Sequence, residues 1–265
     1  MDQITSLNGE NIVVNMFSNI NKTIDVANNN KVFINNEYTQ SFENNFTFNL
    51  LENSSLELTL FDLNKADSVK NNIIFSLNRD SKLKVVIVSL NENLTDSNIV
   101  ADLNATGAEA DVNVISVANS GVNTTFNVVC NNNAPHTKAN ITQRAVALNG
   151  GQNIFEATGY IAKDCSKAVN FQESRVLLLD GAAKGDASPI LLINHHDVEA
   201  GHAAGVSRVN DEEMYYLMSR GIDRKSAEEL MTVAFIRPVV DAIEDEELRE
   251  SVFEKISKKA SYEIN

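Results

Sequence analysis

Three histidines and one aspartate near residue 200 are the side chains of this chain best suited to hold a metal ion. His195, His196 and Asp197 are consecutive, and His202 follows in the segment GHAAGV, which we expect to form a loop. On an extended strand His195 and His196 would point to opposite faces and would not share one ion. His196, Asp197 and His202 would form a site only if the chain folded back, and the spacing HExxH is absent. Polar loop histidines are the plainer interpretation, and His202 is the strongest candidate ligand.

The two cysteines, Cys130 and Cys165, are far apart in the sequence and form no CxxC pair. This pattern does not indicate a disulfide framework. Cys130 ends the apolar run TTFNVVC, and Cys165 lies in KDCSKAV. Because buried cysteine usually behaves as a small apolar residue, we expect both to be structural.

No set of catalytic residues is visible in the sequence. The patterns GxxxxGK[ST], GxGxxG and GxSxG are absent, and the segment LLLDGAAKGDAS has the wrong spacing for any of them. We therefore expect a protein that is not an enzyme. Any nucleotide hydrolysis connected with its function would come from a partner.

Composition narrows the class of protein further. Of 265 residues, 43% are hydrophobic and 22% charged, and the formal net charge is -14. That charge argues against nucleic acid as a partner, because phosphates would be repelled. No apolar run approaches the roughly 20 residues that span a bilayer, and the first residues, MDQITSLNGE, do not resemble a signal peptide. We expect a cytoplasmic protein that binds neither membrane nor nucleic acid.

The first 209 residues consist of short apolar or alternating runs separated by Asn, Asp, Gly and Ser. The runs are NIVVNMF, KVFINN, FTFNLLE, LELTLFDL, NNIIFSL, KLKVVIVSL, DVNVISV, TTFNVVC, NIFEATGYIA, RVLLLDG and PILLI. Each has the length of a strand, and no helical pattern between them could supply crossovers of a doubly wound fold. A sandwich, a barrel or a β-solenoid remains. Asn-rich corners favour the solenoid, because Asn tolerates a left-handed backbone and can stack its amide from one turn to the next.

Residues 210–265 change to a helical period and form the second region of the chain, after the β region at 1–209. Asn210 followed by Glu213 is typical of a capping box, and the first helix should end at Gly221. Its apolar stripe is Met214, Leu217 and Met218. We thus expect a small helical appendix on a mainly β protein.

Two further helices are expected in this appendix. The second should begin at Asp223, present Ala227, Leu230, Met231, Ala234 and Phe235 on one face, and be kinked or interrupted at Pro238. The third, DEELRESVFEKISKKA, has acids in its first turn and lysines in its last, which complement the helix dipole.

Three segments in the second half of the chain resemble one known family. RVLLLDGAAKGDASPILLIN, DVEAGHAAGV and DEEMYYLMSRGI, together with the weaker HTKANITQRAVALNGG, are similar to the C-terminal core of the SufB/SufD family. Its members are scaffold subunits of the SUF iron–sulfur cluster assembly machine. The likeness covers roughly residues 125 to 260. It implies a right-handed parallel β-helix flanked by helices.

Departures from the family pattern make the chain resemble SufD more than SufB. Where SufB-type chains carry a cysteine before the LLL segment this sequence has Ser174, and where they flank the matching histidine with Glu it has Gly201 and Ala203. The Cys that many SufD chains place two residues before the histidine is Ala200. The resemblance is thus to a SufD-like chain shortened at its N-terminus.

The resemblance also implies partners and a site. His202 matches the histidine at the SufB–SufD interface, where the nascent cluster is thought to bind. One imidazole cannot hold a cluster, which needs several thiolates, so we expect no stable cluster on the chain alone and a transient one in the complex. The strands around 171–206 would pair with a SufB-like subunit or a second copy of the chain. The helices would receive a SufC-like ATPase through Tyr215, Tyr216, Arg220 or Phe235.

A second class of function is also compatible with repeated strands and polar corners. A secreted or surface β-helix protein that binds or cleaves carbohydrate would show a secretion signal, aromatic platforms and paired acids. This sequence has no Trp and only 6% aromatic residues. The iron–sulfur scaffold is therefore the favoured function.

Overall fold

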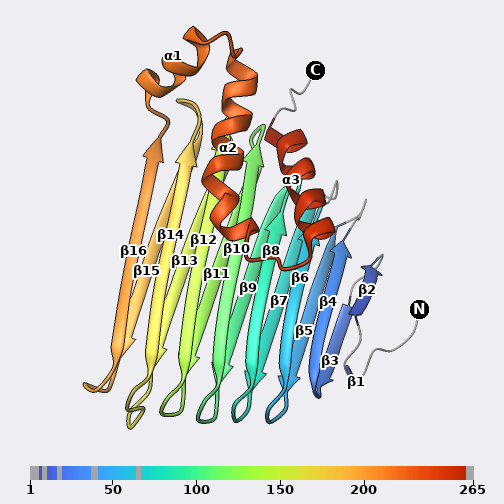
Figure 1. Cartoon of the computed structure of the whole chain (residues 1–265), viewed down its shortest axis with the longest axis vertical. Helices are drawn as coiled ribbons and strands as arrows, with labels where there is room; N and C mark the ends of the chain where they lie inside the picture. The colour runs from blue at the N-terminus through green and yellow to red at the C-terminus, as the bar shows by residue number, and fades with distance from the viewer. Residues whose placement is uncertain (1–5, 8–10, 17–19, 37–40, 64–66, 261–265) are drawn as a thin grey trace.

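The computed structural model describes residues 6–7, 11–16, 20–36, 41–63 and 67–260. Its strands form two eight-stranded sheets, and every strand pairing within those ranges is parallel. The odd sheet has the order β1-β3-β5-β7-β9-β11-β13-β15, and the even sheet has the order β16-β14-β12-β10-β8-β6-β4-β2. The chain passes alternately from one sheet to the other, so each pair of strands is one turn of a β-helix (Figure 1). The expected β-helix with a helical appendix is confirmed.

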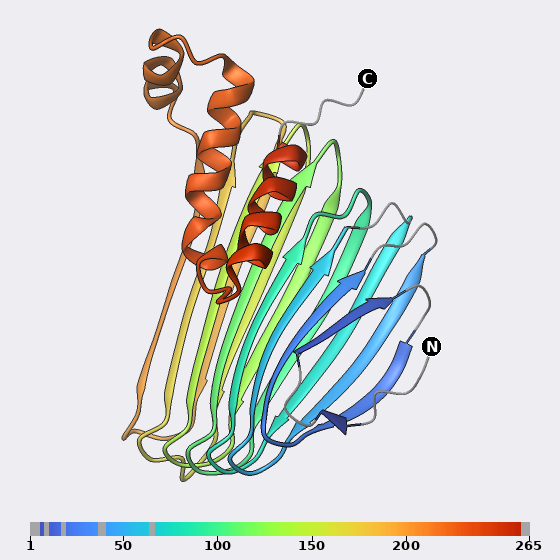
Figure 2. The ribbon, with the colours of Figure 1, turned by 45° about the vertical axis from the view of Figure 1, so that its right-hand side comes forward.

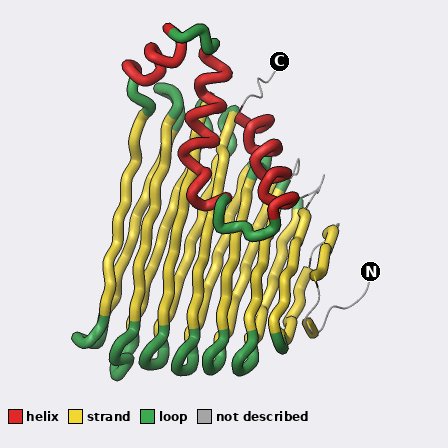
Figure 3. Tube along the Cα trace, in the orientation of Figure 1, coloured by secondary structure: helices red, strands yellow, loops and turns green. Residues whose placement is uncertain are grey.

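Within each sheet the strands follow one another in sequence order. Figure 3 shows them in yellow, with green loops at the corners. Their bounds are β1 (Ser6–Leu7), β2 (Asn11–Met16), β3 (Ile20–Val26), β4 (Asn29–Asn36), β5 (Phe42–Leu50), β6 (Ser55–Asp62), β7 (Ser68–Leu77), β8 (Lys82–Ser89), β9 (Leu94–Leu103), β10 (Glu109–Asn119), β11 (Asn123–Asn132), β12 (Lys138–Leu148), β13 (Gln152–Ile161), β14 (Val169–Leu178), β15 (Lys184–Ile193) and β16 (Glu199–Arg208).

The interior between the sheets is filled by apolar side chains that stack from turn to turn. Phe48 and Phe75 occupy paired positions of β5 and β7, and their ring centroids lie 5.3 Å apart. Phe126 and Phe155 repeat this arrangement in β11 and β13 at 5.9 Å. In-register parallel pairing places equivalent residues directly over one another. Stacked turns of the β-helix therefore bury one another's apolar side chains.

The corners between strands use residues that accept a left-handed backbone. Asn28, Asn53, Asp80, Gly107 and His136 have φ between 53° and 79° at successive corners. Each corner is also hydrogen-bonded to the next, as where the backbone N–H of Asn53 donates to the Arg79 carbonyl. Asparagine and glycine tolerate this conformation better than other residues. The predicted role of Asn at the corners is confirmed.

Asparagine side chains also form a ladder along the outer face of the odd sheet. The amide of Asn72 donates to Asn45 at 2.9 Å, that of Asn98 to Asn72 at 3.3 Å, and that of Asn127 to Asn98 at 3.2 Å. Each rung therefore satisfies the carbonyl of the rung before it. The sequence predicted amide stacking at the corners, where the Asn133 amide does donate to Asn104 Oδ1 at 3.0 Å, and the ladder shows that stacking also occurs within the strands.

The helices α1 (Asp211–Ser219), α2 (Arg224–Val240) and α3 (Glu246–Ala260) follow the last strand. Figure 2 shows α2 and α3 lying along one face of the β-helix. A second apolar core forms there, between outer residues of the even sheet such as Ile115 and Val146 and helix residues such as Ile236, Val240 and Val252. Burial on both faces of the strand explains the unbroken apolar stretch VVIV at residues 85–88 of β8.

Helix α2 differs from the sequence prediction in two details. It is not interrupted at Pro238, which stands in its last turn, and it continues to Val240. The side chains of Leu230 and Ala234 are exposed, and the buried face of α2 is Ala227, Thr232, Ile236, Val239 and Val240. Of the predicted stripe, Ala227, Met231 and Phe235 do face the second core.

The capping of α1 was also predicted only in part. Asn210 caps the helix by accepting from the Glu212 backbone N–H, in place of the expected Glu213 partner. Gly221 follows the helix with φ of +87°, as expected. Of the predicted stripe, Met214 is buried, whereas Met218 is exposed. None of the described helices is long and apolar enough to cross a membrane.

Candidate functional site at the last turn of the β-helix

The last turn of the β-helix, formed by β15 and β16, is open to solvent, and we call it the open end. In the described ranges β15 pairs only with β13, and β16 only with β14, so each presents one unpaired edge. Large apolar side chains are exposed on or beside these strands: Phe171, Ile190, Leu192, Ile193 and Val206. An unpaired strand edge beside exposed apolar surface is the kind of surface that pairs with another chain.

His202 lies in the middle of β16, and the prediction that GHAAGV forms a loop was wrong. The small residues of this segment form a strand because each pairs in register with β14, whose Phe171 ring packs 3.1 Å from the position of a Cβ on Gly201. His202 is the register partner of Gln172, which is 3% exposed and faces the interior. Paired residues of parallel strands share a face. His202 is therefore on the interior side of β16, exposed because no further turn covers it.

The interior directly beneath His202 is polar. Asn170, Gln172 and Ser174 alternate along β14 and are all buried. The Asn170 amide donates to Asn132 Oδ1 at 2.8 Å, and the Gln172 amide donates to the Ile190 carbonyl at 3.0 Å. The Gln172 side chain thus reaches from β14 across the interior to β15. It therefore ties β15, one strand of the open end, to β14 of the turn beneath.

Glycine at position 159 makes room for these two amides. A Cβ there would lie 2.3 Å from Asn170 Oδ1 and 2.5 Å from Gln172 Nε2. Asn170 Oδ1 and Gln172 Oε1 are buried without a hydrogen-bond partner in the structure. Ser174, the position at which SufB-type chains carry cysteine, donates to Gln143 Oε1 at 2.6 Å. The layer beneath His202 is therefore tightly packed, and two of its side-chain oxygen atoms accept no hydrogen bond.

His195 and His196 lie in the bend between β15 and β16, so the argument from opposite faces of a strand does not apply to them. Their ring centroids are 4.9 Å apart. Asp197 is engaged elsewhere: Lys167 Nζ donates to its carboxylate at 2.7 Å, and this hydrogen bond lowers the pKa of Asp197. Across the described residues, no group of three or more His, Cys, Asp or Glu side chains could hold a metal ion. The loop metal site considered from the sequence is not formed there.

Both cysteines are buried and neither forms a disulfide. Burial raises the pKa of the Cys130 thiol to about 12, and burial also raises the pKa of Cys165. Cys165 Sγ lies 3.4 Å from the Asn132 carbonyl, to which it donates. A thiol with a raised pKa is a poor nucleophile and a poor ligand. The structural interpretation of both cysteines is confirmed.

The candidate docking residues of the helices divide into exposed and half-buried ones. Tyr215 and Tyr216 on α1 are 74% and 56% exposed. The guanidinium of Arg220, also exposed, lies 4.9 Å from the Tyr216 ring centroid. Phe235 is half-buried and belongs to the second core. The first three residues are therefore available at the surface, whereas Phe235 packs against the even sheet.

An arginine that sequence reasoning missed connects Phe235 to the open end. Arg144 lies 5.3 Å from the Phe235 ring centroid and donates to Glu173 at 2.7 Å. Glu173 also pairs with Arg175 at 2.6 Å, and both are on β14, beside β16. Burial lowers the pKa of Arg144, although Glu173 opposes this shift. The alternation in NFQESRV could have separated Glu173 and Arg175 from the interior residues, but nothing in the sequence pointed to Arg144.

Comparisons with known proteins agree with the geometry. The family model described as "SUF system FeS cluster assembly, SufBD core domain" matches residues 8–235, most of the chain. A stretch of 119 residues is 44% identical to the iron–sulfur cluster assembly protein SufD of Bacillus subtilis, over 45% of this chain and 27% of that protein. SufBD family proteins of Staphylococcus haemolyticus and Staphylococcus aureus are 31% identical over 105 residues, 40% of this chain and 23% of each relative. Each match thus covers less than a third of the relative's length.

Proposed function

The chain belongs to the SufBD core family of the SUF iron–sulfur cluster assembly system, and from this premise we propose that it is a non-catalytic, SufD-like scaffold subunit of a SUF complex. Its task would be to offer binding surfaces and one cluster ligand. The cluster would be cargo, held only while partner subunits supply the remaining ligands. The family match favours this function over a carbohydrate-directed β-helix.

The observation that carries the proposal is the open end, where His202 is exposed between two strand edges. A SufB-like subunit, or a second copy of this chain, would add its own edge strands to β15 and β16. Main-chain hydrogen bonds would supply affinity, and the exposed apolar side chains Ile190, Leu192 and Val206 would be buried. His202, on the interior side of β16, would then face the partner.

His202 is proposed as the single cluster ligand of this chain. Its neighbours on the same side of β16 are the small residues Ala200 and Ala204, which leave space for a cluster and for a partner's side chains. Cluster binding normally needs several thiolates, and both cysteines of this chain are buried. The thiolates would therefore come from the partner.

The test is reconstitution of the cluster in a complex purified with a SufB-like subunit. We expect His202→Ala to lower the cluster absorbance severalfold while the complex stays assembled, and His195→Ala, a matched surface histidine, to have little effect. Unchanged cluster yield with His202→Ala would contradict the ligand assignment. A stable cluster on the isolated chain would contradict the division of ligands between the subunits.

The second proposed surface is α1 with its exposed aromatic side chains, which would receive a SufC-like ATPase. Exposed Tyr and Arg are the residues most often found at binding hot spots. Tyr215, Tyr216 and Arg220 meet that description, and the half-buried Phe235 would hold α2 in place beneath them. No nucleotide-binding motif is present in the sequence, so the ATPase would be a separate chain.

Point variants test this docking surface better than removal of the helices. We expect the double variant Tyr215→Ala/Tyr216→Ala to lose co-purification with the ATPase, with thermal unfolding unchanged because both side chains are exposed. Tyr160→Ala, on a strand of the opposite sheet, is the control and should keep the ATPase bound. Equal ATPase recovery from both proteins would place the docking site elsewhere.

A further inference from the structure

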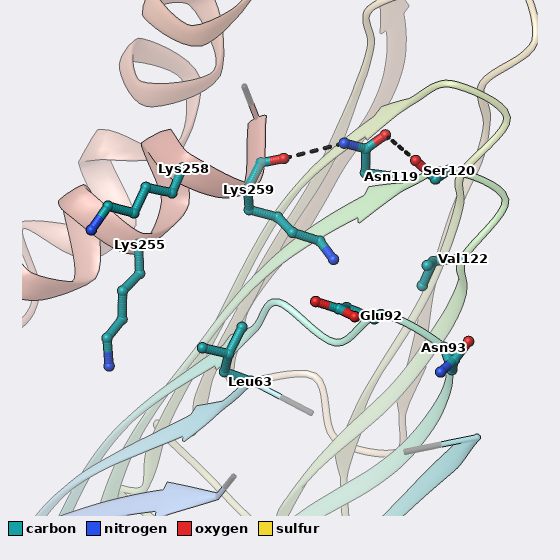
Figure 4. A pocket seen from close by; sticks show the side chains of 9 residues that line it. All are labelled: Leu63, Glu92, Asn93, Asn119, Ser120, Val122, Lys255, Lys258 and Lys259. Atoms are coloured by element: carbon teal, nitrogen blue, oxygen red, sulfur yellow. Dashed lines mark hydrogen bonds between the residues drawn. The ribbon is translucent and has the colours of Figure 1, made fainter. Parts of the chain in front are cut away.

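A cleft of about 530 Å³ lies between the C-terminal end of α3 and the corners that follow β8 and β10 (Figure 4). Three lysines of α3, Lys255, Lys258 and Lys259, form one wall, and we call it the lysine cleft. It involves neither β15 nor β16. Its volume falls in the range of pockets that bind small molecules, about 300–1,000 Å³.

The charge around this cleft is opposite to that of the whole chain, whose formal net charge is -14. Lys258 pairs with Glu254 at 2.6 Å, and Lys255 Nζ lies 4.2 Å from the centroid of the Phe61 ring. Lys259 Nζ donates to a neutral acceptor, the Asn91 carbonyl, at 3.1 Å. Among the described residues, Glu92 is the one carboxylate that lines the cleft. Positive charge therefore exceeds negative charge on its walls.

The Lys259 ammonium is more buried than is required of a lysine at the end of a helix. Lysines at the end of a helix complement its dipole from an exposed position. Burial lowers the pKa of Lys259 below its usual 10.5, and Glu92 only partly opposes this. A partly buried ammonium is stabilised when an anion enters beside it. The cleft thus has a cation whose environment improves on anion binding.

The rest of the cleft is built to hold a ligand of mixed character. The Asn119 amide donates to the Lys259 carbonyl at 3.2 Å, which fixes the end of α3 against the β10 corner. Ser120 Oγ in turn donates to Asn119 Oδ1 at 3.0 Å. Leu63 and Val122 add apolar wall next to the lysines. One side of the cleft therefore suits an anionic group and the other an apolar body.

We propose that the lysine cleft binds a small organic phosphate, with the phosphate beside Lys259 and the organic part against Leu63 and Val122. Figure 4 shows the side chains of Lys255 and Lys259 pointing away from each other, so Lys255 contributes charge from a distance. A phosphate dianion offers more charge and more acceptor oxygens than a carboxylate, and it suits an ammonium group. Since the site does not depend on the scaffold function, it is tested on the isolated 265-residue chain.

The experiment is a titration of the ¹⁵N-labelled chain with phenyl phosphate, followed by the backbone amide signals of Asn93 and Ser120. We expect saturable shifts at these amides. Lys259→Gln should weaken binding about tenfold, through loss of one charge-assisted contact, and Lys255→Gln, which removes a more distant charge, should weaken it less. Lys163→Gln removes the same charge from an exposed corner and should leave the affinity unchanged.

Each other outcome would overturn a stated part of the proposal. Absence of saturable shifts, or equal affinity of the parent and both cleft variants, would overturn the site. Equal binding of benzyl alcohol would show an apolar cavity that does not recognise phosphate. If inorganic phosphate bound as tightly as phenyl phosphate, the proposed contact of the organic part with Leu63 and Val122 would be wrong. If Lys259→Gln does not fold, Lys255→Gln and the shifts of the parent protein decide the question.

Discussion

Replacing Gly159 by alanine should destabilise the protein although glycine-to-alanine changes in regular structure are usually favourable. The added methyl group would lie 2.3 Å from Asn170 Oδ1 and 2.5 Å from Gln172 Nε2, closer than the 3.0 Å that real Cβ contacts respect. Both side chains are buried, at 0% and 3% exposure, so neither can move into solvent. The methyl group can be accommodated only if hydrogen bonds in the layer beneath His202 are broken.

The size of the effect follows from the two bonds most directly affected. Moving Asn170 and Gln172 would break the bonds to Asn132 Oδ1 at 2.8 Å and to the Ile190 carbonyl at 3.0 Å. Leaving a buried polar group without its partner costs about 1–3 kcal/mol each. The lower entropy of an unfolded alanine chain returns only about 0.4–1 kcal/mol. We expect the free energy of unfolding to fall by about 1–5 kcal/mol.

Urea unfolding followed by circular dichroism measures this change. Gly181→Ala is the matched control, because nothing lies within 4 Å of its Cβ position and its φ is not in the left-handed region. It should shift the free energy of unfolding by no more than about 0.5 kcal/mol. If Gly159→Ala behaves like this control, the tight packing deduced beneath His202 is wrong.

Two further predictions concern charge and thiol chemistry. Glu244 forms ion pairs with Lys31 at 2.9 Å and Lys84 at 3.3 Å, and all three side chains are about a third or more exposed. Glu244→Gln should therefore lower the free energy of unfolding by less than about 1 kcal/mol, and by less still in high salt. These bonds hold the pKa of Glu244 below its usual 4.5. Its contribution to stability is therefore complete above pH 4.5 and is lost as the pH falls through the lower pKa of the folded protein. If the unfolding curves of parent and variant stayed equally far apart in acid, this pH dependence would be contradicted. Cys130 and Cys165 should react with iodoacetamide at about pH 8 only after unfolding, because burial raises the pKa of both thiols. A labelled cysteine in the native protein, detected by mass spectrometry, would show that its burial is wrong.

The strand region was predictable where apolar residues are dense and not where they are sparse. The runs NNIIFSL and KLKVVIVSL coincide with β7 and β8, whereas four strands longer than the two-residue β1 have no matching run in the sequence analysis: β3, β9, β12 and β16. The four missed strands carry many polar or small residues, such as the GHAAG of β16. They are strands because neighbouring turns supply their hydrogen bonds. Stacking on a neighbouring turn is not visible in local composition.

The sequence identified the candidate residue of the site but not the residues that surround it. His202 was identified by the resemblance of its segment, and its position on the interior side of β16 emerged only from its pairing with Gln172. Arg144, Gly159 and Gln172 are distant from it in sequence and gave no local signal. Their importance depends on which strands stack on which. The register of the stacked strands depends on many turns and corners together, and not on any local segment.

The helical region and the β-helix share one apolar core, and this decides how the docking proposal can be tested. Ile236, Val240 and Val252 pack on Ile115 and Val146, which are otherwise on the outer face of the even sheet. Deleting residues 211–265 would expose that face to water, and contiguous apolar surface of this kind promotes aggregation. Loss of ATPase binding by such a deletion would follow from misfolding as readily as from loss of the docking site. Exchange of the exposed Tyr215 and Tyr216 leaves the shared core untouched, so only their substitution separates docking from folding.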